Sequence, residues 1–122
     1  MKDKWIEKFI KDAVPKIIEE LGSAKIIIFD SRIKGNAKDE SDIDVIIISH
    51  YFKNIPFLKR MPKLLKLVRF DKHIDFLCYT EEEFEKVKRS SVVVSYALKE
   101  AIWIDTSQIL PVKLKERKNE ES

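Results

Sequence analysis

Two apolar runs separated by a polar stretch form the clearest pattern in this chain. Residues 26–29 (IIIF) and 45–48 (VIII) are rich in β-branched side chains and contain no polar residue. Such runs predict strands that are buried on both faces. Residues 30–41 between them hold serine, glycine, asparagine and charged residues, which is typical of a loop. The pattern therefore predicts two central strands joined by a polar loop.

Apolar residues at helical spacing predict a helix over residues 4–21, ended by Gly22 as a left-handed cap. Pro15 falls inside this helix, so we expect a kink or a split there. A second helical pattern covers residues 57–69 and is interrupted by Pro62, so this helix is expected to be short or broken. Its polar face, expected to be solvated, carries the basic residues Lys59, Arg60, Lys63, Lys66 and Arg69.

Alternation over residues 72–79 predicts a third strand. Thr80 and Glu83 form a capping-box pattern that begins a helix over 81–88, and another helix begins near Ser90. Residues 102–105 read as a short last strand. These elements predict an α/β fold, a short mixed sheet of about four strands with helices packed on one side. We expect one domain over residues 1–113 and a charged, disordered tail over 114–122.

Composition narrows the classes of protein to which the chain can belong. It has 122 residues, which fits one domain, and 37 % of them are charged, against about 25 % in an average protein. This excess of charge is typical of heat-adapted proteins. The net charge of +3 gives little reason to expect a nucleic-acid partner.

The single cysteine, Cys78, excludes an internal disulfide and a cysteine-based metal site. With no signal peptide and no apolar run of about twenty residues, we expect a cytoplasmic protein without a membrane partner.

Three aspartates are the candidate metal ligands. Asp42 and Asp44 are two apart at the start of the second strand, so they face one way with Cα atoms roughly 6.6 Å apart. If the third strand is a neighbour, Asp75 joins them, and such hard oxygen ligands suit Mg²⁺ or Mn²⁺ rather than zinc. We expect His73 to point to the opposite face from Asp75. An alternative stays open, in which Asp42 caps a turn, Asp44 lies on an edge strand and Asp75 forms a surface salt bridge.

The loop before these acids holds groups that suit phosphate binding. Ser31 offers a hydroxyl, Arg32 a planar donor fork, and Gly35 permits tight backbone geometry. Ser31 is followed by ten residues and then by Asp42-Ile43-Asp44.

The order of these features, a strand, a loop with serine, a strand that begins Asp-x-Asp and a later strand with a third acid, resembles the DNA polymerase beta-like nucleotidyltransferase superfamily. The resemblance is to the small minimal nucleotidyltransferases in particular. Their pattern is Gly-Ser, ten residues and Asp-x-Asp, with a third acid on a later strand. Ser31, Arg32 and Gly35 match the loop Gly-Ser-Arg-x-x-Gly, and residues 73–77 (HIDFL) look like the strand of the third acid. The resemblance covers roughly residues 17–105.

The resemblance implies a nucleotidyltransferase fold and a metal-dependent reaction. Asp42, Asp44 and Asp75 would bind Mg²⁺ or Mn²⁺, and Asp75 would also activate the attacking hydroxyl. Ser31 would hold the terminal phosphates of a nucleoside triphosphate, which we expect to be ATP. The hydroxyl would attack the α-phosphate and release pyrophosphate, with no nucleic acid required.

One position departs from the family pattern, because Asp30 stands where the family has glycine. Its carboxylate either turns away from the triphosphate, binds a cation, or impairs the site. The last outcome leads to an alternative function, an antitoxin-like module that binds a helical HEPN-type partner. Assembly into a homo-oligomer also stays open.

A third alternative makes Asp30 a phosphotransfer aspartate, as in haloacid-dehalogenase-like phosphatases or receiver domains. It is disfavoured because Arg32 stands where the phosphatases need an acid, and because the stretch between the two central strands is predicted to be a loop rather than a helix.

Overall fold

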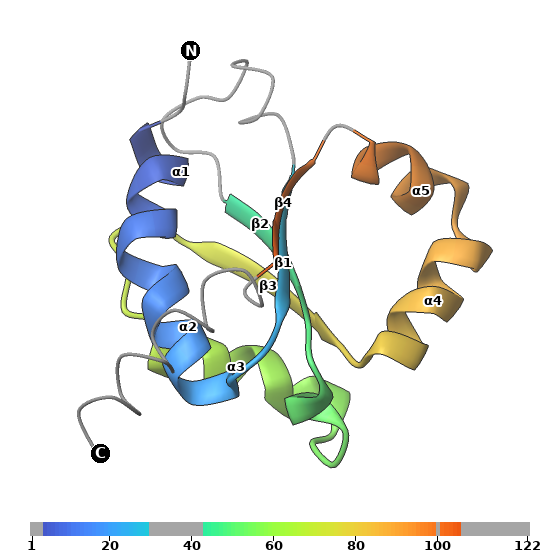
Figure 1. Cartoon of the computed structure of the whole chain (residues 1–122), viewed down its shortest axis with the longest axis horizontal. Helices are drawn as coiled ribbons and strands as arrows, with labels where there is room; N and C mark the ends of the chain where they lie inside the picture. The colour runs from blue at the N-terminus through green and yellow to red at the C-terminus, as the bar shows by residue number, and fades with distance from the viewer. Residues whose placement is uncertain (1–3, 30–42, 100, 106–122) are drawn as a thin grey trace, which may run out of the picture.

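The computed structural model describes residues 4–29, 43–99 and 101–105, which form a four-stranded mixed sheet flanked by helices (Figure 1). The elements in chain order are α1 (Lys4–Lys8), η1 (Phe9–Ala13), α2 (Val14–Leu21), β1 (Lys25–Phe29), β2 (Ile43–Ile48), η2 (His50–Phe52), α3 (Phe57–Leu67), β3 (Ile74–Tyr79), α4 (Glu81–Ser90), α5 (Val92–Leu98) and β4 (Ile102–Asp105). The predicted α/β class is confirmed. The predicted domain limit at residue 113 and the tail 114–122 lie outside the described residues. Within the described part of the chain, no helix is long and apolar enough to cross a membrane.

The N-terminal helical run passes its proline without a break. Between α1 and α2 lies the π-helical turn η1, in which the Val14 amide donates to the Phe9 carbonyl oxygen five residues back. Pro15 has no amide hydrogen to give, and the wider turn before it lets the helix continue. The expected kink or split is therefore taken up by η1. The run ends at Gly22, as predicted, but its φ of +82° comes with a ψ of −98°, which lies outside the left-handed helical region, so the cap is not the predicted left-handed one.

The strand order in the sheet is β3-β2-β1-β4. β1 is antiparallel to both β2 and β4, whereas β2 and β3 are parallel and are joined through η2 and α3. The antiparallel pairing of the two central strands argues against the receiver-domain alternative, which needs parallel strands joined by helices. The parallel pairing of β2 with β3 brings the N-terminal ends of these two strands to the same edge of the sheet.

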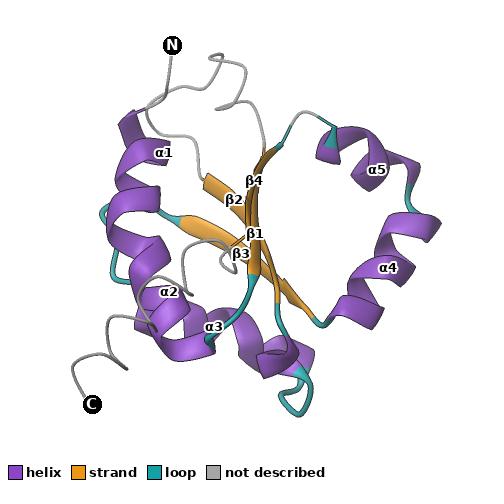
Figure 2. Cartoon of the chain, in the orientation of Figure 1, coloured by secondary structure: helices purple, strands orange, loops and turns teal. Residues whose placement is uncertain are grey.

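Helices cover both faces of the sheet, so the expectation that they pack on one side is wrong (Figures 1 and 2). On one face, α1, η1, α2 and α3 bury Ile26 and Ile28 of β1 with alternate residues of β2 and β3. On the other, Ile27 packs with Phe84 of α4 and Leu98 of α5. The continuous apolar strands required two covered faces. Their pattern does not say that helices after β3 would supply the second cover.

Arg60 of α3 corrects a second expectation, because it is buried rather than part of a solvated basic face. Its side chain is 4 % exposed. Nε donates to the Ile55 carbonyl oxygen at 2.8 Å, and Nη1 donates to the Cys78 carbonyl oxygen at 3.0 Å. Nη1 and Nη2 donate to the two carboxylate oxygens of Glu83 at 2.6 and 3.2 Å. This guanidinium therefore ties α3 to the end of β3 and to the first turn of α4.

Candidate active site

Two carboxylates lie side by side at one end of the sheet. Asp44 and Asp75 are the second residues of β2 and β3, and their Cα atoms are partners in the parallel register. Neighbouring strands are about 4.8 Å apart, and paired residues project to the same face. That face is the one covered by α4 and α5, because Ile46, two residues beyond Asp44, packs in the same cluster as Phe84. The strand adjacency on which the convergence of acids depended is therefore present.

His73 lies beside Asp75, so the expectation that it points to the opposite face is wrong. His73 Nε2 lies 3.0 Å from Asp75 Oδ1, and the two side chains are 53 % and 47 % exposed. The reason is periodicity, because residues two apart along an extended segment project to the same side. The spacing His73-x-Asp75 was therefore the sequence signal for this contact. When Nε2 carries a hydrogen, this ring N–H donates to the carboxylate and restricts the orientation of Asp75.

The chemistry of this pair fits a hard divalent cation. Asp44 and Asp75 offer carboxylate oxygens, the ligands that Mg²⁺ and Mn²⁺ prefer, and magnesium commonly binds one or two carboxylates together with phosphate oxygens. Adjacent carboxylates also repel each other unless a cation is near. Among the described residues, no group of three or more His, Cys, Asp or Glu side chains is placed to hold a metal ion. The predicted further ligand, Asp42, lies outside that part of the chain.

The other predicted site residues also lie outside the described residues. These are Asp30, Ser31, Arg32 and Gly35. The two ends of their segment are placed, however, because Phe29 ends β1, Ile43 begins β2, and Phe29 is the register partner of Asp44. The segment that carries the predicted phosphate loop therefore leaves and rejoins the sheet next to Asp44.

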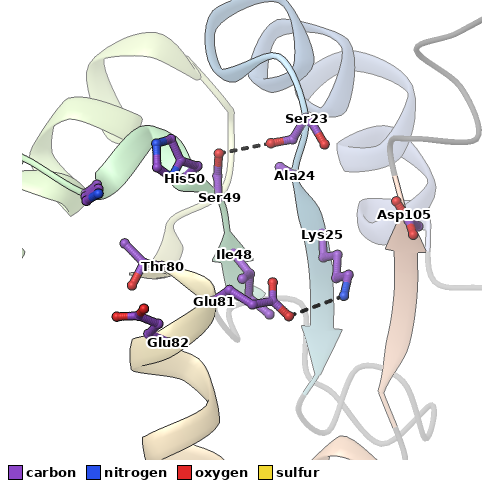
Figure 3. A pocket seen from close by; sticks show the side chains of 11 residues that line it. Ser23, Ala24, Lys25, Ile48, Ser49, His50, Thr80, Glu81, Glu82 and Asp105 are labelled. Atoms are coloured by element: carbon purple, nitrogen blue, oxygen red, sulfur yellow. Dashed lines mark hydrogen bonds and ion pairs between the residues drawn. The ribbon is translucent and has the colours of Figure 1, made fainter.

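A cavity of about 530 Å³ lies at the opposite end of the sheet, where β1 begins and β2 ends (Figure 3). Lys25 and Glu81 form an ion pair there at 3.5 Å, and the Ser49 hydroxyl donates to the Ser23 carbonyl oxygen at 2.9 Å. This cavity could not be predicted from the sequence, because its lining comes from segments far apart in the chain. Its size alone names no chemistry, whereas the paired carboxylates do. We therefore place the candidate active site at Asp44 and Asp75.

Comparisons with known proteins bear on the family and the fold of this chain. A family model described as "Nucleotidyltransferase domain" matches residues 4–115. Among solved structures, a "putative nucleotidyltransferase" from Sulfolobus solfataricus is 23 % identical with a TM-score of 0.49, over 84 % of this chain and 87 % of that one. Another "putative nucleotidyltransferase" is 23 % identical with a TM-score of 0.53, over 80 % of this chain and 97 % of that one, which supports the fold. No curated protein matches the chain significantly.

Proposed function

Because this chain belongs to the nucleotidyltransferase domain family, we propose that it transfers a nucleoside monophosphate from a nucleoside triphosphate, ATP in the first instance, to a hydroxyl acceptor. The observation that carries this proposal is the register pairing of Asp44 with Asp75 on one face of adjacent parallel strands. Carboxylates paired at a strand end can hold divalent cations, which would neutralise the negative charge on the phosphate oxygens during an in-line transfer to a hydroxyl.

In the proposed step, the acceptor hydroxyl oxygen attacks the α-phosphorus of the triphosphate. The hydroxyl proton passes to the Asp75 carboxylate, whose Oδ1 is held by His73 Nε2 at 3.0 Å. A bond forms between the acceptor oxygen and the α-phosphorus, and the bond from that phosphorus to the bridging oxygen breaks. Pyrophosphate leaves with the electron pair of the broken bond. Asp75 then returns its proton to solvent, which restores the site.

A bound divalent cation, Mg²⁺ or Mn²⁺, would neutralise negative charge on the phosphates. Asp44 and Asp75 would hold it together with Asp42. We assign phosphate binding to Ser31, Arg32 and Gly35, whose segment begins and ends beside Asp44. The acceptor hydroxyl in this proposal belongs to a separate molecule, such as a partner protein.

A second candidate function is favoured by Asp30, which replaces the family's glycine next to the predicted phosphate loop. A carboxylate 4 Å from a phosphate oxygen costs about 4 kcal/mol at an effective dielectric of 20, or roughly a thousandfold in affinity. If nothing offsets this cost, the domain has lost nucleotide binding. It then serves as an antitoxin-like module that binds a helical HEPN-type partner.

Calorimetric titration of ATP with Mg²⁺ separates the two functions. Wild type is compared with Asp30→Gly and with Asp44→Asn/Asp75→Asn, and Asp12→Asn/Glu19→Gln serves as the control because both of its residues are exposed acids of the N-terminal helical run. Binding by wild type and the control, with loss in Asp44→Asn/Asp75→Asn, supports the transferase. Binding by Asp30→Gly alone supports the second function. If none of the four proteins binds, or if the Asp44→Asn/Asp75→Asn variant binds as wild type does, the proposed metal–nucleotide site is refuted.

A further inference from the structure

A cavity of about 350 Å³ opens beside the candidate active site, at the segment that joins α3 to β3. One part of its lining is apolar and comes from Leu65, Val68 and Phe70, and the other part carries the basic side chains of Arg69, Lys72 and His73. β3 is an edge strand of the sheet, and the cavity lies at its N-terminal end, where Asp75 is the second residue of the strand. An apolar wall next to a cationic rim fits a ligand that has both an apolar body and a negative group.

His73 connects this cavity to the reacting carboxylate. It lines the cavity, and its Nε2 lies 3.0 Å from Asp75 Oδ1. A molecule seated in the cavity is therefore one side chain away from the carboxylate that takes the acceptor's proton. Binding an acceptor close to a catalytic carboxylate favours the reaction, because it holds the hydroxyl in a geometry from which it can react.

The charge of the lining is positive. Asp71, an acid in the lining, is already paired with Lys8 at 2.6 Å, which lies on the N-terminal helical run. Arg69 is exposed and makes no hydrogen bond or ion pair with the other described residues. Lys72 Nζ lies 5.4 Å from the Trp5 ring centre, and Lys72 forms no ion pair with a carboxylate in the part of the chain that the structure describes. The guanidinium of Arg69 thus has its donor fork available for a carboxylate or a phosphate.

The position of the cavity separates it from the predicted nucleotide phosphates. The segment with Ser31 and Arg32 joins β1 to β2, and in the strand order β3-β2-β1 both of its ends lie on the far side of Asp75 from β3's outer edge. A triphosphate held by that segment would approach the carboxylates from β1 and β2. The cavity lies before the start of β3, and its apolar wall belongs to the core on the other face of the sheet, so an acceptor seated there reaches Asp75 around the start of this edge strand, past His73.

We propose that this cavity binds the acceptor, and that the acceptor carries a carboxylate or phosphate and an apolar group next to its reactive hydroxyl. This inference rests on the proposed transferase function and names its acceptor class. Arg69 and Lys72 bind the negative group, Leu65, Val68 and Phe70 contact the apolar body, and the hydroxyl reaches Asp75 past His73.

The test measures acceptor binding without requiring turnover. The probes are a short peptide with tyrosine flanked by leucine and glutamates, the same peptide with lysines in place of the glutamates, and glycerol 3-phosphate as a small phosphate-bearing alcohol. Each is titrated into the ¹⁵N-labelled full chain with Mg²⁺, and amide shifts of residues 68–75 report the dissociation constant. The proteins are wild type, Arg69→Gln/Lys72→Gln, and the control Lys59→Gln/Lys66→Gln, which removes two exposed charges of α3 outside the cavity lining.

We expect the glutamate peptide or glycerol 3-phosphate to bind wild type and the control alike, and to bind Arg69→Gln/Lys72→Gln at least tenfold more weakly. Preference for the peptide identifies a protein acceptor, and preference for glycerol 3-phosphate identifies a small molecule. The lysine peptide should not shift these amides. The inference is overturned if neither anionic probe shifts them, or if the control weakens binding as much as the cavity variant.

Titration of ATP with Mg²⁺ into the same proteins completes the test. Unchanged nucleotide affinity in Arg69→Gln/Lys72→Gln is expected, and an equal loss of ATP and probe binding would assign the cavity to the nucleotide and overturn the inference. Failure of the proposed function is distinct from this outcome. It would show as absence of ATP binding by wild type while the anionic probe still shifts residues 68–75.

Discussion

The buried guanidinium of Arg60 makes Glu83→Gln the most informative change to the stability of this domain. Glutamine has the shape and reach of glutamate and is accepted at the third position of a capping box, so Thr80 can keep its reciprocal hydrogen bonds with the first turn of α4. The change therefore removes the negative charge and little else. What remains is a cation that is 4 % exposed and whose acceptors among the described residues are neutral.

The expected loss is about 2 kcal/mol of unfolding free energy. Removing one partner of a fully buried ion pair costs about 3–5 kcal/mol. The Glu83 side chain is 42 % exposed, so water already screens part of its interaction with Arg60, and we reduce the buried value by about half. Two charge-assisted hydrogen bonds at 2.6 and 3.2 Å, of which glutamine can keep one, lead to a similar figure.

Urea unfolding measures this loss, and its pH dependence identifies the charge as the cause. The hydrogen bonds from Arg60 lower the pKa of Glu83 from its ordinary value of 4.5 to about 2. A carboxyl whose pKa is lower in the folded state stabilises the fold above its unfolded pKa, and this contribution is lost as the pH falls through the folded value. The difference between wild type and Glu83→Gln should therefore be full at pH 7 and shrink between about pH 4.5 and 2.

The matched control is Glu82→Gln, an exposed acid in the same first turn of α4 that shares the interaction with the helix dipole. It should cost no more than about 0.5 kcal/mol. If Glu82→Gln and Glu83→Gln reduce stability equally, or if the Glu83→Gln loss is the same at pH 3 and pH 7, the reasoning about the buried guanidinium is refuted.

Three further changes test other parts of the fold. Gly22→Ala should lower the unfolding free energy by about 1–3 kcal/mol, because a φ of +82° with a ψ of −98° is a backbone conformation that alanine rarely adopts, and no atom lies within 4 Å of the added methyl group to cause a clash; a loss below 0.5 kcal/mol in urea unfolding would contradict this. Burial raises the pKa of the Cys78 thiol to about 12, so a disulfide reagent at pH 8 should label it only after denaturation. Phe84→Ala should lower the unfolding free energy by about 3 kcal/mol, because Phe84 is 3 % exposed in the core between the sheet and helices α4 and α5. Leu58→Ala, at a side chain that is 86 % exposed, should leave the unfolding free energy nearly unchanged in the same measurement.

The sequence by itself determined where most helices and strands of this protein lie and how its candidate site residues are spaced along the chain. The spacing of apolar residues located the strands and helices, because the buried face of a strand recurs every two residues and that of a helix about every 3.6 residues. Local motifs gave the caps, Gly22 by its freedom at positive φ and Thr80 with Glu83 by reciprocal hydrogen bonds. The family to which the chain belongs was also indicated by residue types and their spacing along the chain.

Tertiary structure alone decided which elements meet. Periodicity shows that a strand is covered on both faces, but the cover comes from distant segments, so the packing of α4 and α5 on the second face could not be read from β1 and β2. Arg60 lies on a helix whose other basic side chains are exposed, and only the approach of Glu83 and of the end of β3 gives its charge a buried partner. Likewise, Asp44 and Asp75 are 31 residues apart. They become neighbours because β2 and β3 pair in parallel at one register, which depends on long-range hydrogen bonds and core packing rather than on either segment alone.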